Sequence, residues 1–423
     1  MKVSANRAFS LLKELAYERV SCSEAEKQAA NKLLEVALST GASAHIEEFP
    51  VACGKVHHAK LVVTEPYVKE YEVTGYERGL STPEGGVDLP FYYAEAAEDV
   101  HLCNVKGKAV MVNGRLGKKV YEKLMKAGVA AILTFDGSTI DRRSETDCDI
   151  RKLREVLTED CGACTALHMR TMDAAEIVRR GAKKMHIELN AEDYEGTSQN
   201  VCAVIEGSEY PDEIISFGAH YDSVYFSTGV YDNMSGSVII MELLRYFAEH
   251  KPARTMKFNL YGSEEQGLLG SKAWVKAHED ELDKHVLMVN IDVAAPILGK
   301  NGAPVLATDK AVGYVDALMR EAGIACEAKL DIYSSDCIPF ADKGVPAVNL
   351  IRFGVPGAGY IHDRRDNLKS NYLSAEALDI TLQQALMFAQ RIDSAKVFPI
   401  ERKISEEITK KVDEYLFKKK EKK

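Results

Sequence analysis

The stretch EIISFGAHYD, residues 213–222, is an apolar run that ends abruptly in His220 and Asp222. Similar runs follow along the chain, among them TMKFNLYG at 255–262 and VLMVNIDV at 286–293. Helical patterns over residues 233–249 and 268–279 separate these runs. Continuous apolar strands that alternate with helices are typical of a mostly parallel sheet covered by helices on both faces. We therefore predict an α/β fold with a mixed, mostly parallel sheet.

The residues able to carry chemistry occur where the apolar runs stop. Ligands of open α/β sheets bind beyond the carboxyl ends of the strands, so side chains at these positions are expected to gather at one edge. The positions are His220, Asp222, Asp232, Glu264, Glu265, Asp292 and His362.

Each of these residues, taken alone, has an ordinary structural explanation. A histidine two residues before an aspartate is more often a hydrogen-bonded core histidine than a ligand, and Asp232 stands where an aspartate would cap the following helix. Asp292 differs, because it closes an otherwise buried run and a buried carboxylate needs a partner. Together, two histidines and several carboxylates form a mixed nitrogen and oxygen set that suits zinc and related divalent metals.

The 423 residues suffice for two or three domains, and 46% hydrophobic content supports substantial cores. A formal charge of −10 argues against a general nucleic-acid binder, whose surface would be basic. No segment approaches the roughly 20 apolar residues of a membrane span, and the N-terminus lacks the pattern of a signal peptide. Nine cysteines without a dense framework fit a reduced compartment. We expect a cytoplasmic protein, although a chain trimmed of its leader would show the same pattern.

The predicted secondary structure changes along the chain. Residues 5–19 and 23–40 are predicted helices, the second capped by Ser23. Short β-rich runs dominate residues 55–190, which we interpret as an inserted unit. Residues 1–54 and 191–400 would then form one discontinuous domain. The tail, 401–423, is predicted to be an amphipathic helix with a lysine-rich end that is solvated.

One cysteine pair, Cys161 and Cys164, has the CxxC spacing of zinc ribbons and redox motifs. No second CxxC follows, and His168 would supply only a third ligand. Ordinary structural cysteines are the favoured interpretation.

The motifs GAHYDS, YDNMSGS, YGSEEQGLLGS, NIDV and GYIHDRRD, in this order and spacing, resemble the zinc aminopeptidase family. That family includes bacterial leucine aminopeptidases, glutamate carboxypeptidase II, the transferrin receptor and glutaminyl cyclases. The resemblance covers roughly residues 5–50 and 195–395, and it implies the zinc-peptidase fold. The middle unit, residues 55–190, contains the stretch NVKGKAVMVNGRLGKKVYEKLMKAGVAAILTFDGS at 104–138. With this stretch it resembles the protease-associated domain that is often inserted in these enzymes.

The resemblance implies two divalent metal ions, most simply zinc. Asp232 would bridge both ions, His220 and Asp292 would complete one site, and Glu265 and His362 the other. Glu264 would be the catalytic general base that activates the metal-bound water, and Asp222 would hold His220 from behind. Adjacent carboxylates at a strand end suit this division, because the base must be separate from the ligands yet within reach of the water.

Two positions depart from the family pattern. Cys337 replaces a histidine that many relatives have after Ser-Asp, so a contact near the pocket differs. The aromatic residue often found directly before the last histidine ligand is displaced: Tyr360 is two residues upstream of His362. Tyr360 is therefore a candidate contact to the substrate or the transition state.

The resemblance implies a metallo-exopeptidase acting on peptides, most simply an aminopeptidase. A carboxypeptidase of the same fold and a glutaminyl-cyclase-like acyltransferase are the alternatives, and the latter typically needs only one zinc. A non-catalytic, receptor-like relative ranks last, because the candidate ligand set is complete. Side-chain specificity, physiological substrate and oligomeric state do not follow from the sequence.

Overall fold

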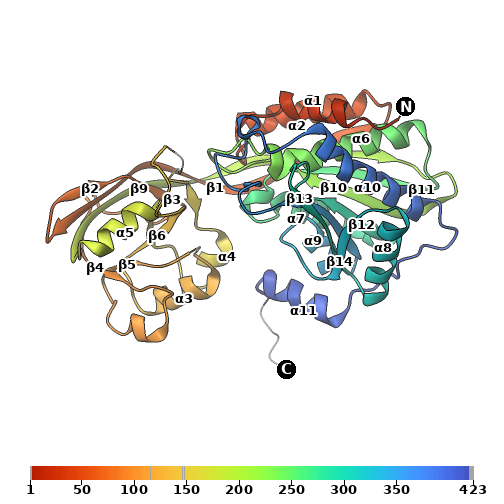
Figure 1. The fold of residues 1–423 in the computed structure, drawn as a ribbon. Coiled ribbons are helices and arrows are strands. Elements are labelled where there is room, and N and C mark those ends of the chain that lie inside the picture. Colours follow the sequence, from red (N-terminus) through yellow and green to blue (C-terminus); the bar gives the residue numbers. More distant parts are fainter. Residues whose placement is uncertain (1, 115, 145, 147, 419–423) are drawn as a thin grey trace. The chain divides into compact units, whose positions relative to one another are not determined.

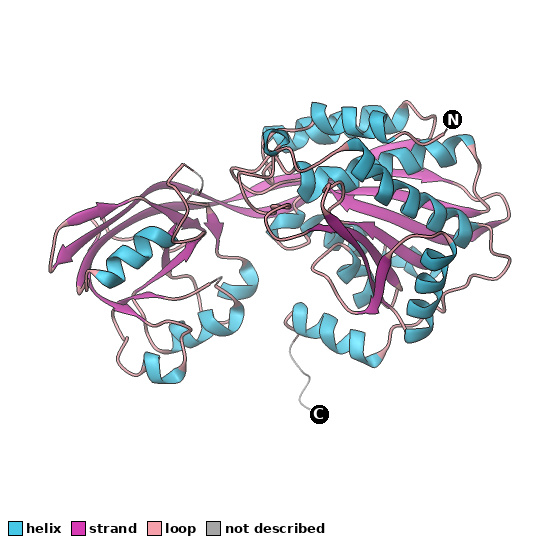
Figure 2. Cartoon of the chain, in the orientation of Figure 1, coloured by secondary structure: helices cyan, strands magenta, loops and turns pink. Residues whose placement is uncertain are grey.

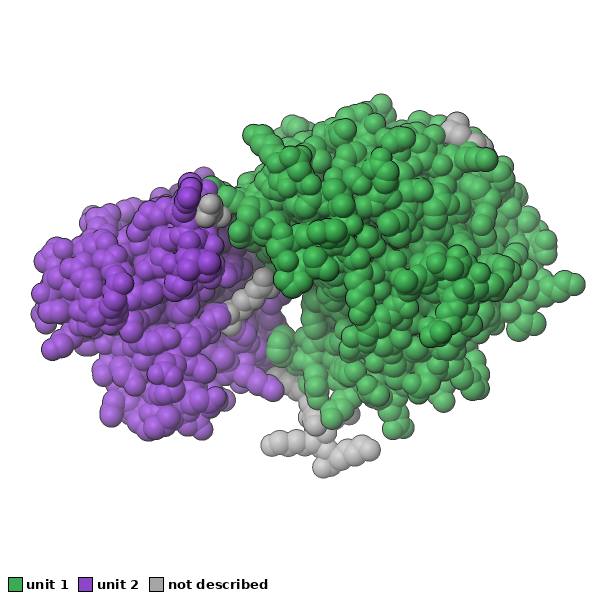
Figure 3. All heavy atoms as spheres, viewed as in Figure 1, with its two compact units in different colours: residues 1–50, 197–423 green, residues 51–196 purple. Residues whose placement is uncertain are grey.

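The computed structural model of the chain describes residues 2–114, 116–144, 146 and 148–418. Residues 419–423, which contain the end of the predicted lysine-rich tail, lie outside this range. The chain divides into two compact units, Met1–Pro50 with Thr197–Lys423 (unit 1) and Val51–Gly196 (unit 2), coloured separately in Figure 3. Two long strands contribute residues to both units, β1 (Ser43–Glu65) and β9 (Lys184–Ile205). The predicted boundaries, 54/55 and 190/191, fall inside these strands.

The sheet of unit 1 has the strand order β14-β13-β15-β12-β10-β11-β9. Strand β10 pairs in parallel with β11 and β12, and β12 pairs in parallel with β15. Antiparallel pairing occurs between β11 and β9 and between β13 and β15. The bounds of the remaining strands are Tyr210–His220 (β10), Arg254–Tyr261 (β11), His285–Ile291 (β12), Gly299–Leu306 (β13), Cys326–Leu330 (β14) and Ala347–Gly354 (β15).

Helices cover both faces of this sheet (Figures 1 and 2). One apolar cluster packs one face under α1 (Ala5–Glu14), α2 (Glu24–Leu38), α6 (Ser235–Glu249), α8 (Asp309–Glu321) and α10 (Ala375–Asp393). A second cluster packs the other face under α7 (Leu269–Ala277), α9 (Cys337–Asp342) and α11 (Glu406–Tyr415). Side chains alternate between the clusters along β12, with Leu287 and Val289 in the first and Met288 in the second. The predicted α/β fold with a mostly parallel sheet is confirmed.

The bounds of the two N-terminal helices differ in how well they were predicted. The hydroxyl of Ser23 accepts a hydrogen bond from the backbone N–H of Glu26, as predicted for the start of α2. The predicted helix over residues 5–19 is too long, because α1 ends at Glu14. The chain turns after Leu15 and buries the guanidinium of Arg19, which donates hydrogen bonds to the carbonyls of Leu15 and Tyr17.

Unit 2 has its own sheet, in the order β9-β4-β5-β6-β8-β3-β7, and two apolar clusters. Its other strands are β2 (Lys69–Tyr71), β3 (Val73–Glu77), β4 (Val87–Tyr93), β5 (Ala109–Met111), β6 (Ala131–Asp136), β7 (Arg151–Lys152) and β8 (Thr165–Arg170). Its helices are α3 (Lys118–Lys126), α4 (Glu155–Thr158) and α5 (Thr171–Arg179).

The cysteine pair of unit 2, Cys161 and Cys164, packs in the apolar core of that unit. Cys164 is buried in one of the apolar clusters and Cys161 packs against it, and both are free thiols. Nδ1 of buried His168 lies 2.9 Å from the hydroxyl of Thr134, so this histidine is engaged by its own sheet.

The C-terminal tail contributes to unit 1 through α11. Ile408 and Val412 are buried in the second apolar cluster, and Ile404 and Leu416 pack against it. No helix within the described part of the chain is long and apolar enough to cross a membrane.

Candidate metal centre

Parallel strand pairing brings the predicted site residues to one edge of the unit 1 sheet. His220 is the last residue of β10 and lies opposite Tyr261, the last residue of β11. Glu264 and Glu265 follow β11 in a short 3-10 turn, Glu264–Gln266, and Asp292 directly follows β12. His362 lies in the loop after β15. The carboxyl ends of four strands therefore supply side chains to a single place.

Asp232 lies between the two histidines. Its Oδ1 is 3.2 Å from Nε2 of His220, and its Oδ2 is 3.3 Å from Nε2 of His362. Asp232 is not an N-cap, because the backbone at Asp232 and Asn233 is non-helical and α6 begins only at Ser235. Each carboxylate oxygen thus faces a different imidazole, the arrangement needed for a carboxylate that bridges two cations.

The remaining carboxylates divide between these imidazoles. Oε2 of Glu265 lies 2.9 Å from Nε2 of His362. Oδ1 of Asp292 lies 3.8 Å and Oε2 of Glu264 lies 3.9 Å from Nε2 of His220. One ligand atom each from His220, Asp232 and Glu265 fall within 4.8 Å of one another.

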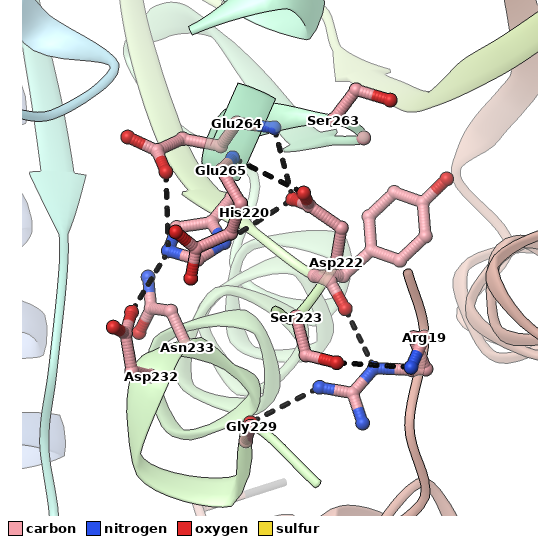
Figure 4. Close-up of polar contacts among 12 residues, drawn as sticks. Arg19, His220, Asp222, Ser223, Gly229, Asp232, Asn233, Ser263, Glu264 and Glu265 are labelled. Carbon is pink, nitrogen blue, oxygen red and sulfur yellow. Dashed lines mark hydrogen bonds and ion pairs between the residues drawn. The ribbon is translucent and has the colours of Figure 1, made fainter. Parts of the chain in front are cut away.

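Asp222 connects the histidine to the glutamate pair, as Figure 4 shows. Its Oδ1 lies 3.3 Å from Nδ1 of His220. The same carboxylate accepts hydrogen bonds from the backbone N–H groups of Glu264 at 3.0 Å and Glu265 at 3.2 Å. One fully buried residue therefore orients the imidazole and also anchors the turn that carries both glutamates.

Burial controls the protonation of this cluster. It raises the pKa values of Glu264, Glu265 and Asp292 above the usual carboxyl range. Burial acts in the same direction on Asp232, but hydrogen bonds from His220 and His362 outweigh it and lower the pKa of Asp232. Because two imidazoles can balance only two negative charges, the remaining carboxyl groups of the cluster need a proton or a cation.

The donor set fits divalent metal ions. Oε1 of Glu265 and Oδ1 of Asp292 are buried without a hydrogen-bond partner in the part of the chain that the structure describes. Such oxygens are costly unless a cation or a proton meets them. Imidazole nitrogens combined with carboxylate oxygens are ligands of zinc and its neighbours.

Buried ionisable side chains that were not singled out from the sequence hold the loops around the cluster. Oδ1 and Oδ2 of Asp366 accept hydrogen bonds from the backbone N–H groups of Tyr231 at 2.8 Å and Asp232 at 3.0 Å. Burial raises the pKa of Asp366 to about 7. Asp366 lies four residues after His362 and ends the motif GYIHDRRD, which is its signal in the sequence.

Two further side chains of this kind come from the N-terminal region. The guanidinium of Arg19 donates to the backbone carbonyls of Tyr221 at 2.6 Å and Gly229 at 3.0 Å, bracing the loop between His220 and Asp232 (Figure 4). Glu26, on the first turn of α2, accepts a hydrogen bond from the backbone N–H of Ser263 at 3.0 Å, directly before the glutamate pair. Both side chains are fully buried, which helical periodicity alone does not reveal.

Two tyrosines, Tyr360 and Tyr333, are candidates for contact with the substrate or the transition state. The hydroxyl of Tyr360 donates to the carbonyl of Gly357 at 3.4 Å, and its ring packs against Tyr372 and Arg365. Tyr333 was not singled out from the sequence. Burial raises the pKa of Tyr333, and the charges of Asp292, Asp232 and Glu264 raise it further.

Cys337, the departure from the family pattern, begins α9 and is fully buried. Burial raises the pKa of its thiol, which is therefore protonated at neutral pH. The thiol belongs to the apolar cluster under α7 and α9.

Known proteins are similar to this chain in sequence. A family model described as peptidase family M28 matches residues 200–389, a range that contains all the candidate ligands. The chain is 24% identical to carboxypeptidase Q of Mus musculus over 269 residues, which are 59% of this chain and 56% of that protein. It is 32% identical to aminopeptidase YwaD of Bacillus subtilis (strain 168) over 163 residues, 37% of this chain and 36% of that protein. The chain thus spans less than two thirds of either relative.

A solved structure shares the fold across nearly the whole chain. BSAP, a zinc aminopeptidase from Bacillus subtilis, superimposes with a TM-score of 0.76 at 20% sequence identity, covering 96% of this chain and 99% of that one. Residues 200–389 therefore match peptidase family M28, and the predicted resemblance to the zinc aminopeptidase family is confirmed.

Proposed function

We propose that the protein is a two-metal exopeptidase, most simply an aminopeptidase that releases N-terminal residues from peptides. The family match and the shared fold support a metallopeptidase with peptide substrates. The observation that carries the two-metal proposal is Asp232, whose oxygens lie 3.2 and 3.3 Å from the two imidazoles. His220 and Asp292 would hold one ion, and Glu265 and His362 the other.

Bound zinc ions would lower the pKa of water and polarise the scissile carbonyl. The protein supplies the geometry. Asp222 holds His220 and the backbone of both glutamates in one orientation, so the ligands and the base keep a constant spacing.

Glu264 is the proposed general base. It is 8% exposed and belongs to the same turn as Glu265, but its carboxylate lies toward His220 rather than His362. Its buried carboxylate takes a proton from the attacking water and later delivers it to the leaving amine.

A hydroxyl beside the carboxylates would donate a hydrogen bond to the oxygen of the scissile carbonyl as negative charge develops there. Tyr360 is the candidate from the sequence. We add Tyr333, because the charges of Asp292, Asp232 and Glu264 act on its hydroxyl and raise its pKa.

Similarity to carboxypeptidase Q favours one alternative, hydrolysis from the carboxyl end. A glutaminyl-cyclase-like acyltransferase is the other. A panel of peptides with free or blocked termini, assayed with and without added zinc, separates all three. Cleavage only of substrates with a free amine, by protein that holds about two metal ions at this centre, supports the aminopeptidase. Cleavage of N-blocked peptides from the carboxyl end, or cyclisation of N-terminal glutamine with one ion, assigns the alternative instead. Metal-free protein that gains no activity with zinc, cobalt or manganese overturns the proposal.

A further inference from the structure

A second group of metal-ligating side chains lies in unit 1, separate from the M28 centre. Ligand atoms of His45, Glu47 and Cys202 all lie within 4.8 Å of one another. His45 and Glu47 project from β1 and Cys202 from β9, so two strands supply the three side chains. Nε2 of His45 is 2.9 Å from Oε1 of Glu47.

His278, at the C-terminal end of α7, approaches Glu47 as well. Its Nε2 lies 2.9 Å from Oε1 and 3.1 Å from Oε2 of Glu47. Its Nδ1 lies 2.8 Å from Oε1 of Glu281, which in turn pairs with Lys257. A carboxylate on one ring nitrogen, with the other nitrogen directed at the ligand group, is how proteins orient a metal-binding histidine. The ring stacks on Trp274, with 4.3 Å between ring centroids, which fixes its plane.

The depth of these side chains suits a bound ion. Cys202 is 5% exposed, whereas the His45 side chain is 59% exposed and that of Glu47 is 22% exposed. The thiol therefore lies at the bottom, and the imidazole and carboxylate form the entrance from solvent. One sulfur, two imidazole nitrogens and one carboxylate oxygen are the donor types of tetrahedral zinc sites.

We propose that His45, Glu47, Cys202 and His278 form a zinc site distinct from the M28 centre, one that fastens the end of α7 to strands β1 and β9. The proposal does not rest on the peptidase assignment. Without metal, Glu47 pairs with both imidazoles, and these ion pairs give way as the ion takes the same donors. Burial raises the pKa of the Cys202 thiol, so zinc must displace its proton to solvent and binding strengthens as pH rises.

Cobalt(II) provides a selective test, because only a cysteine ligand gives a near-ultraviolet sulfur-to-cobalt charge-transfer band. The ligands proposed for the M28 centre are nitrogen and oxygen atoms, so cobalt bound at that centre does not contribute to this band. The full-length protein is titrated with Co²⁺, and the band is compared between the wild type and single variants. Trp274, the only tryptophan in the sequence, gives a second readout through its fluorescence, because it stacks on His278.

The wild type and Cys103→Ser, a control at an exposed cysteine, are expected to develop the same band. Cys202→Ser is expected to abolish it. Glu281→Gln, which removes the carboxylate behind His278, is expected to weaken Co²⁺ affinity by about 10- to 100-fold, and His45→Gln by at least as much.

His45 is largely exposed, so His45→Gln is expected to fold normally, and circular dichroism checks this. No band in the wild type, or a band that survives in Cys202→Ser, overturns the site. A band that is lost in Cys202→Ser but unchanged in both His45→Gln and Glu281→Gln shows binding by the thiol alone and also overturns it.

Discussion

Replacing Glu264 by glutamine separates proton transfer from metal binding. Glutamine has nearly the same shape, and the backbone N–H of residue 264 stays bonded to Asp222, so the turn is expected to keep its conformation. The change removes the group that accepts the proton. Loss of a positioned general base costs about 10²- to 10⁴-fold in rate. Since each factor of ten is about 1.36 kcal/mol, the activation barrier rises by roughly 3 to 5 kcal/mol.

Glu265→Gln is the matched control, because it makes the same chemical change one residue later. Oε2 of Glu265 lies 2.9 Å from Nε2 of His362, whereas Oε2 of Glu264 lies 3.9 Å from Nε2 of His220. We therefore expect Glu265→Gln to hold one metal ion fewer than the wild type, while Glu264→Gln keeps the wild-type metal content. The assays are kcat on a chromogenic aminoacyl amide, metal content by atomic emission, and thermal unfolding by circular dichroism.

The roles are misassigned if Glu264→Gln keeps more than a tenth of the wild-type kcat and Glu265→Gln retains its full metal content. A loss of metal in Glu264→Gln would also refute the reasoning, because it would make Glu264 a ligand. A large fall in unfolding temperature in either variant would show that the turn itself had been disturbed.

Three further predictions concern groups outside the ligand set. Asp366→Asn leaves the backbone N–H of Tyr231 or Asp232 facing an amide donor, so the protein is expected to lose about 1 to 3 kcal/mol of unfolding free energy, measured in urea, and to bind zinc more weakly. Glu26→Gln is expected to shift the turn at Ser263 and lower kcat by about 10- to 100-fold with its metal content unchanged; an unaltered kcat would contradict this. Burial and the charge of Arg151 lower the pKa of His168 to about 3, so the stability that neutral His168 contributes is fully present above pH 6.5 and is lost as the pH falls from 6.5 toward 3; His168→Gln is expected to flatten that dependence in thermal unfolding curves.

Most of the fold follows from the local pattern. Apolar strands alternating with helices predicted a mostly parallel sheet. Such strands are apolar along their length because an apolar cluster packs against each face of the unit 1 sheet. Boundaries were less predictable where a tertiary contact outweighs helix propensity. Residues 15–19 have a helical composition, yet Arg19 leaves the helix because carbonyls of a distant loop bind its guanidinium.

The sequence alone determined which side chains stand at strand ends, because hydrophobic periodicity and chain order depend on neighbouring residues. It also indicated a mixed nitrogen and oxygen donor set. Only the tertiary structure decided that the two oxygens of Asp232 face different imidazoles, and that Asp222 holds both His220 and the glutamate turn. These contacts, like the carboxylates of Glu26 and Asp366 behind the loops, join residues far apart in the chain. Strand register and burial bring such residues together, and neither can be predicted from neighbouring residues alone.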